Sequence, residues 1–183
     1  MEWAGTGSQR VIVRWSLIRS AEDAGVFAAK LTAHFDPSLR RTSISGVLDY
    51  ASGLFDRNGF RGLRRVIDVS GDGPNNQGRM VTSARDDTVA RGIVINGLPL
   101  MTRDGMGSYW HLEDLDAYYE DCVIGGPGAF VVPVHAWEHF PAAVRRKLVL
   151  EIAALPPTNN TGGGLLQLTN ASGYDCLIGE KIW

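Results

Sequence analysis

The fold is decided by the stretch Arg65-Val66-Ile67-Asp68-Val69-Ser70 and by the loop that follows it. The β-branched side chains of this stretch predict a central strand, since they pack well on a pleated and buried surface. The strand continues into Gly71-Asp72-Gly73-Pro74-Asn75-Asn76, whose residue types are typical of a loop. We therefore expect a buried strand that ends in polar side chains.

Strand and helix patterns alternate on both sides of this stretch. Apolar, largely β-branched runs predict further strands over residues 10–15, 93–98 and 129–134. Helical patterns predict helices over residues 20–35, 44–55, 112–119 and 140–152, and a polar segment with helical potential covers residues 83–91. This alternation is typical of an α/β, Rossmann-like fold with a mainly parallel sheet and helices on both faces. Binding sites in such folds lie at the carboxyl ends of the strands.

Three local signals mark helix ends. Ser20 is expected to cap the first helix, which we expect to lie on the sheet. Asn58-Gly59 is expected to close the second helix, because glycine readily adopts the conformation that ends a helix. Pro141 suits the first turn of the last helix, where its missing N–H costs no hydrogen bond.

Length and composition favour one folded domain followed by a tail. The chain has 183 residues, of which 44% are hydrophobic, and this is enough for a single buried core. We expect residues 1–155 to form the α/β domain. Residues 156–183 are expected to form a Gly/Asn-rich connector and a C-terminal tail.

Charge and hydropathy exclude several classes of partner. The formal net charge is −2, so the sequence predicts no binding to nucleic acid or to an anionic membrane surface. No apolar run reaches the roughly 20 residues that span a bilayer. Met1-Glu2-Trp3 lacks the basic and apolar regions of a signal peptide. The chain as written is expected to be soluble and without a targeting signal.

Two cysteines, Cys122 and Cys176, can be two buried thiols or one disulfide, and their number leaves both alternatives open. Each lies beside an apolar Ile-Gly segment. We therefore predict that the two approach closely enough to pair if the tail folds back over the helix and loop near Cys122. A disulfide would favour an oxidising compartment, and two thiols the cytoplasm.

Three stretches together form a specific pattern: residues 64–76, residues 92–99 and residues 123–131. In these stretches the chain resembles a von Willebrand factor A-type domain, and in particular a bacterial group of that fold without a characterised function. The resemblance runs from about Trp3 to Ala154. It implies a sheet whose upper edge carries a binding site, and relatives that are often exported.

The resemblance also implies a metal-ion-dependent adhesion site, held by an Asp-x-Ser-x-Ser turn, a threonine and an aspartate. Thr42 resembles the threonine ligand, and Asp72 resembles the aspartate that acts through water. Thr42 can equally cap the helix that follows it. The Asp-x-Ser-x-Ser turn would belong to a strand before Met1, so the domain is expected to be N-terminally incomplete. Two protein ligands predict only weak binding of Mg²⁺ or Mn²⁺.

A protein-interaction module is therefore the leading hypothesis, with a cation that helps to grip an acidic group on a partner. No catalytic residue is assigned under this hypothesis. The missing strand would leave backbone groups of the strand at residues 65–70 unpaired, which predicts instability or self-association. Another alternative is a shortened chain without retained activity. Within the strand itself, Asp68 and Ser70 are expected to satisfy local backbone amides.

The enzyme alternative is a zinc-dependent hydrolase and rests on His135-Ala136-Trp137-Glu138-His139, which fits the H-x-x-E-H pattern of inverted zinc peptidases. That chemistry needs both histidines on one helical face, with the glutamate beside a zinc-bound water. Pro141 instead places the motif at a helix start. His34, His111 and Cys122 have no neighbouring partners that would assemble a nucleophilic triad.

Overall fold

The computed structural model describes residues 1–31, 41–102, 112–153 and 173–182. The strands are β1 (Glu2–Trp3), β2 (Gln9–Arg10), β3 (Arg65–Gly71) and β4 (Ile93–Pro99). The α-helices are α1 (Ala21–Ala29), α2 (Ile44–Leu54), α3 (Val81–Ala90), α4 (Leu115–Tyr118), α5 (Phe140–Ala153) and α6 (Ile178–Ile182). Shorter turns are the 3₁₀ turns η1 (Phe55–Arg57) and η4 (Trp137–His139) and the π turn η3 (Tyr119–Val123).

A small parallel sheet lies at the centre. β3 pairs with β4 in parallel, from Arg65 opposite Ile93 to Gly71 opposite Pro99. Two parallel bridges, at Val131 and Val134, continue the sheet on the far side of β4. The predicted strands at residues 65–70 and 93–98 are therefore confirmed, and the one at residues 129–134 is reduced to these bridges.

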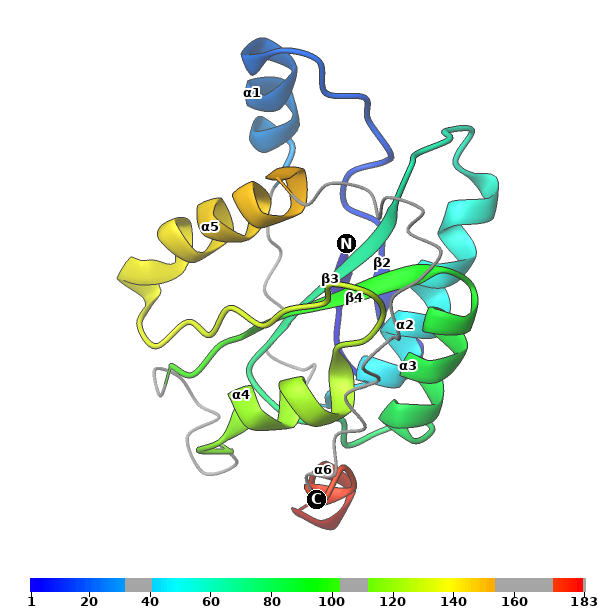
Figure 1. Ribbon diagram of the computed structural model, residues 1–183, viewed down its shortest axis with the longest axis vertical. Coiled ribbons are helices and arrows are strands. Elements are labelled where there is room, and N and C mark those ends of the chain that lie inside the picture. The colour runs from blue at the N-terminus through cyan, green and yellow to red at the C-terminus, as the bar shows by residue number, and fades with distance from the viewer. Residues whose placement is uncertain (32–40, 103–111, 154–172, 183) are drawn as a thin grey trace, which may run out of the picture.

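Helices cover both faces of this sheet (Figure 1). Side chains alternate along a strand, so neighbouring residues of β3 and β4 enter different cores. Ile67 and Ile95 belong to the main core with Leu48 of α2, whereas Leu98 packs with Ala143 of α5 in a second core. The expected α/β class is therefore confirmed as a small parallel sheet with helices on both faces.

The other edge of β3 faces away from β4. Within the described residues β3 has β4 as its strand neighbour, and its outer edge borders a pocket of about 200 Å³. Met1, Trp3, Val47 and residues 67–70 line this pocket. Backbone groups along a strand edge are ready to pair with another strand. Self-association through this edge stays a prediction.

The predicted strand at residues 10–15 is wrong beyond its first residue. β2 covers only Gln9–Arg10 and pairs antiparallel with β1. Trp15 instead packs its ring edge to face with Phe55, with 5.1 Å between the ring centroids. This tertiary contact outweighs the local preference of the segment for a strand, because strand preference depends strongly on context.

Helix α1 begins as predicted, because Ser20 accepts a hydrogen bond from the backbone N–H of Asp23 at 3.1 Å. None of its residues is buried, and the helix projects from the rest of the domain (Figure 1). The expectation that it lies on the sheet is wrong. Val26 and the following Leu31 stay about half exposed there, at 51% and 53%. Residues 32–35 of the predicted helix lie outside the described residues.

Helix α2 is confirmed and carries much of the main core through Ile44, Val47 and Leu48. Its N-cap is Ser43, whose hydroxyl accepts from the Gly46 N–H at 3.2 Å. The alternative in which Thr42 caps this helix is therefore wrong. η1 extends the helix by a turn before Gly59, whose φ of +76° suits the predicted closure.

The remaining helices follow the predicted positions closely. α3 and α5 are confirmed, and Pro141 lies in the first turn of α5. The helix predicted over residues 112–119 starts later, at Leu115, and continues as η3 to Val123. Within the described part of the chain, no helix has the length and apolar character needed to cross a membrane.

The C-terminal tail returns to the domain. Cys122 of η3 and Cys176 form a disulfide with 5.5 Å between their Cα atoms, so the predicted approach of the two cysteines is confirmed. The tail then ends in the short helix α6. The predicted connector at residues 156–172 lies outside the described residues.

Candidate functional site

The carboxyl end of β3 carries a loop that is hydrogen-bonded to the segment before α2. The Thr42 N–H donates to Asn76 Oδ1 at 2.8 Å, and the Asn76 N–H donates to the Thr42 carbonyl oxygen at 2.9 Å. These reciprocal bonds join two segments that are 34 residues apart in the chain. The two loops named by the family resemblance are thus neighbours in space.

Within this pair of loops, the Thr42 hydroxyl lies close to the turn that follows Asp72. A Cβ atom built on Gly73 would lie 3.6 Å from Thr42 Oγ1. The Asp72 side chain is exposed, and Thr42 is half-buried. With Ser43 serving as the helix cap, the Thr42 hydroxyl is not needed for that role. The edge therefore presents one hydroxyl and one carboxylate on adjacent loops.

Asn75 organises the loop, and the sequence prediction did not single it out. Its side chain is fully buried. Its Oδ1 accepts from the Ser45 N–H at 2.9 Å, and its own N–H donates to Tyr118 Oη at 3.1 Å. Its Nδ2 donates to Glu180 Oε1 at 2.8 Å. Asparagine is a common loop residue, so the sequence carries no signal that separates this buried residue from an exposed one.

A buried tyrosine lies below the same edge. Within the described residues, Tyr119 Oη has no hydrogen-bond partner. Burial raises the pKa of this phenol well above its ordinary value, and the charges of Tyr118 and Asp72 add to the shift. The group therefore stays protonated. A Cβ atom on Gly71 would come within 2.9 Å of Tyr119 Oη and 3.2 Å of the Trp3 ring, so a larger residue here would displace one of these rings.

Among the described residues, Thr42 and Asp72 would offer a divalent cation at this edge two oxygen ligands. Mg²⁺ takes near-octahedral oxygen coordination and retains several waters when protein ligands are few. Thr42 and Asp72 provide one neutral hydroxyl and one carboxylate. The protonated Tyr119 hydroxyl can donate a hydrogen bond but adds no negative charge. Further oxygen ligands would have to come from water or from a partner.

The expectation that Asp68 satisfies local backbone amides is wrong, because its carboxylate binds side chains that are distant in the sequence. Its carboxylate pairs with Lys147 of α5 and accepts from Asn96 Nδ2 at 3.3 Å. Lys147 Nζ also contacts Glu151 Oε2 at 3.2 Å. Burial raises the pKa of Glu151, and the neighbouring Asp68 carboxylate raises it further. The cluster fixes α5 to the sheet.

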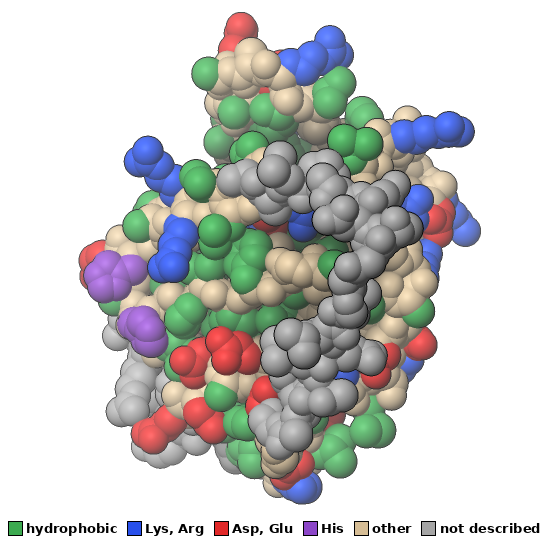
Figure 2. Space-filling model, in the orientation of Figure 1, with side chains coloured by type: hydrophobic (Ala, Val, Ile, Leu, Met, Phe, Trp, Pro, Cys, Tyr) green, Lys and Arg blue, Asp and Glu red, His purple; other side chains and the backbone are tan. Residues whose placement is uncertain are grey.

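The zinc motif lies on the surface near the start of α5. His135 is in a bend, while Glu138 and His139 belong to the single turn η4, and all three residues are exposed. Figure 2 shows the two described histidines in purple at one margin of the molecule. The described ranges contain no group of three or more His, Cys, Asp or Glu side chains arranged to hold a metal. His34 and His111 lie outside the described residues.

Comparison with known proteins identifies the family. No curated protein and no solved structure matches the chain. Residues 1–156 match the model of a family described as protein of unknown function (DUF1194). Because this match covers most of the chain, the protein belongs to the DUF1194 family.

Proposed function

We propose that this domain is a protein-interaction module that binds its partner through the two loops at the carboxyl end of β3. The observation that carries the proposal is the placement of the Thr42 hydroxyl beside the turn after Asp72, held there by the reciprocal bonds between Thr42 and Asn76. Loops at this end of parallel strands are the usual place for a binding site in an α/β fold.

We also propose that the domain has a von Willebrand factor A-like arrangement within the α/β class. A von Willebrand factor A-like arrangement is supported by the parallel pairing of β3 with β4 and by helices on both faces. The juxtaposition of the loops containing Thr42 and Asp72 supports it further. The disulfide between Cys122 and Cys176 favours an oxidising compartment as the place of action.

The proposed ligand is an acidic group on a partner protein. Mg²⁺ or Mn²⁺, when bound, would supply the positive charge that attracts a carboxylate. Asp72 and Thr42 would hold that ion, and the partner's carboxylate would complete its oxygen ligands. With a single protein carboxylate, we expect cation affinity in the free domain no tighter than about millimolar.

The test is an NMR titration of the full chain with MgCl₂, followed by MnCl₂ as a paramagnetic probe. We expect saturable amide shifts at Thr42 and Gly73 below about 20 mM Mg²⁺ and selective line broadening there with Mn²⁺. Asp72→Asn should abolish both effects. Asp86→Asn is the matched control, because Asp86 is an exposed aspartate that pairs with Arg85 on α3.

Two results would contradict the proposal. Unchanged Thr42 and Gly73 amides throughout both titrations would remove the cation-assisted site. Stoichiometric zinc in the purified protein that is lost in His139→Ala would favour the hydrolase alternative. Micromolar Mg²⁺ binding that depends on Asp72 would instead show that the site has more ligands than the proposal assigns.

A further inference from the structure

The C-terminal tail is attached to the core at a point close to the candidate site. Cys122 is fully buried in the main core, and its disulfide partner Cys176 is half-buried on the tail. Tyr174, Cys176 and Ile178 pack against the same core. The rings of Tyr174 and Tyr118 meet edge to face with 6.0 Å between their centroids. The tail is therefore packed into the domain at this point.

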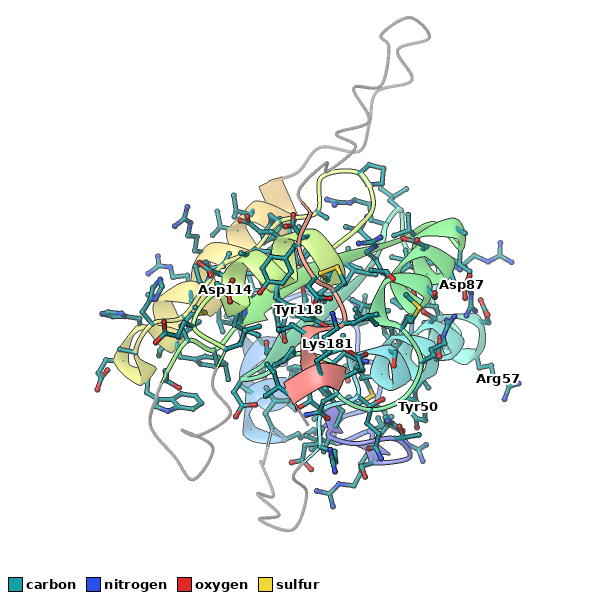
Figure 3. The ribbon with its side chains drawn as sticks, turned by 90° about the horizontal axis from the view of Figure 1, so that it is seen from below. Tyr50, Arg57, Asp87, Asp114, Tyr118 and Lys181 are labelled. Carbon is teal, nitrogen blue, oxygen red and sulfur yellow. A yellow bond between two sulfur atoms is a disulfide. The ribbon has the colours of Figure 1, made fainter. Side chains whose placement is uncertain are left out.

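Helix α6 contacts the loop residue Asn75 in two ways. A Cβ atom built on Gly179 would lie 2.0 Å from the Asn75 carbonyl oxygen, so backbone packs directly on backbone here. The Glu180 carboxylate accepts from Asn75 Nδ2 at 2.8 Å. Figure 3, in which Tyr118 and Lys181 are labelled, shows α6 lying against this part of the domain.

Asn75 and its neighbour Asn76 connect α6 to the candidate site. The Asn75 Oδ1 accepts a hydrogen bond from the Ser45 N–H at the start of α2. The next residue, Asn76, accepts from the Thr42 N–H through its side chain and donates to the Thr42 carbonyl oxygen through its own N–H. Asp72 lies three residues before Asn75 in the same loop. Packing and hydrogen bonds thus link the disulfide-anchored tail through Asn75 and Asn76 to Thr42, and the same loop contains Asp72.

We propose that formation of the Cys122–Cys176 disulfide docks α6 on Asn75 and orders the site, so that the domain binds its partner only in the oxidised state. This inference rests on the proposed function and adds a redox requirement to it. α6 has five residues, which is too short for a helix to be stable by itself. The disulfide keeps α6 at a high effective concentration beside Asn75.

The redox step is an exchange with a small disulfide such as oxidised glutathione. The two cysteine thiols together lose two protons and two electrons as the bond between their sulfurs forms. The small disulfide accepts them and leaves as two thiols. In the reverse direction, a dithiol attacks the more accessible Cys176 sulfur, releases the Cys122 thiol, and closes its own disulfide as Cys176 leaves.

The test compares backbone order parameters from ¹⁵N relaxation in the oxidised chain and after treatment with dithiothreitol. We expect Ser45, Asn75 and Asn76 to fall from about 0.85, a rigid value, to below about 0.6 on reduction. Residues of β4 should keep their values. Unchanged order at these three loop residues in a reduced chain whose α6 has become mobile would overturn the proposal.

A second variant covers the case in which the reduced chain unfolds. Gly179→Ala retains both cysteines and places a methyl group against the Asn75 carbonyl, so it should loosen the same residues with the disulfide intact. Lys181→Ala is the control on α6, because Lys181 pairs with the exposed Asp175. A rigid loop in Gly179→Ala would overturn the inference. The order measurement does not depend on metal binding, so failure of the cation titration remains a separate result.

Discussion

Replacement of Lys147 by methionine tests the buried ionic cluster that joins α5 to the sheet. The Lys147 side chain is only 8% exposed and contacts both Asp68 and Glu151. Methionine has a similar length and retains most of the packing of the lysine stem. The substitution therefore removes the charge and leaves two carboxylates close together without their cation.

The expected loss follows from that geometry. Removal of one partner from a buried ion pair costs about 3–5 kcal/mol, because the remaining charge stays buried without compensation. Asp68 is 33% exposed and can be partly hydrated, so the lower end of the range applies. We expect the free energy of unfolding to fall by about 3 kcal/mol near neutral pH. The loss should shrink in acid, where the carboxylates become protonated.

Urea unfolding followed by circular dichroism measures this change. With a slope of about 2 kcal/mol per molar urea, the midpoint should fall by roughly 1.5 M. Lys181→Met is the matched control, since the Lys181–Asp175 pair is exposed and such pairs contribute less than about 1 kcal/mol. A loss below about 1 kcal/mol in Lys147→Met, with an unchanged slope, would refute the conclusion that this cluster holds α5.

Four further predictions concern pH, the disulfide, the buried phenol and the sheet edge. The raised pKa of Glu151 means that its contribution to stability is fully present below the ordinary value of 4.5 and is lost as pH rises through the raised value. Glu151→Gln should therefore flatten the pH dependence of urea stability above pH 4.5, and an identical slope in both proteins would contradict this cause. The double variant Cys122→Ala/Cys176→Ala should lose about 4 kcal/mol in urea unfolding because the bond closes a long loop, and a loss near zero would show that the tail is not constrained by it. Tyr119→Phe should raise stability by about 1 kcal/mol by removing a buried hydroxyl that has no hydrogen-bond partner among the described residues, whereas a clear loss would show that the hydroxyl is satisfied. The outer edge of β3 should give concentration-dependent self-association in sedimentation velocity, and a monomer at all concentrations would count against strand pairing there.

The agreement between prediction and structure is closest where a feature depends on neighbouring residues. The Ser20 cap of α1 and the position of Pro141 in α5 follow from backbone groups within one helical turn. The strand β3 follows from the β-branched residues Val66, Ile67 and Val69 within a short stretch. Such signals depend on hydrogen bonds and side-chain periodicity within a short stretch, so the linear sequence contains them.

Tertiary structure decided the features that join distant residues. Asp68 and Lys147 are 79 residues apart, and the disulfide joins residues 54 apart, although the sequence left its formation open. Asn75 became the buried centre of the loop because α2, Tyr118 and α6 surround it. Sequence resemblance named Thr42 and Asp72, but only folding brought their loops together. The physical reason is that long-range contacts require chain closure, and the favourable packing that offsets its entropy exists only in the folded domain.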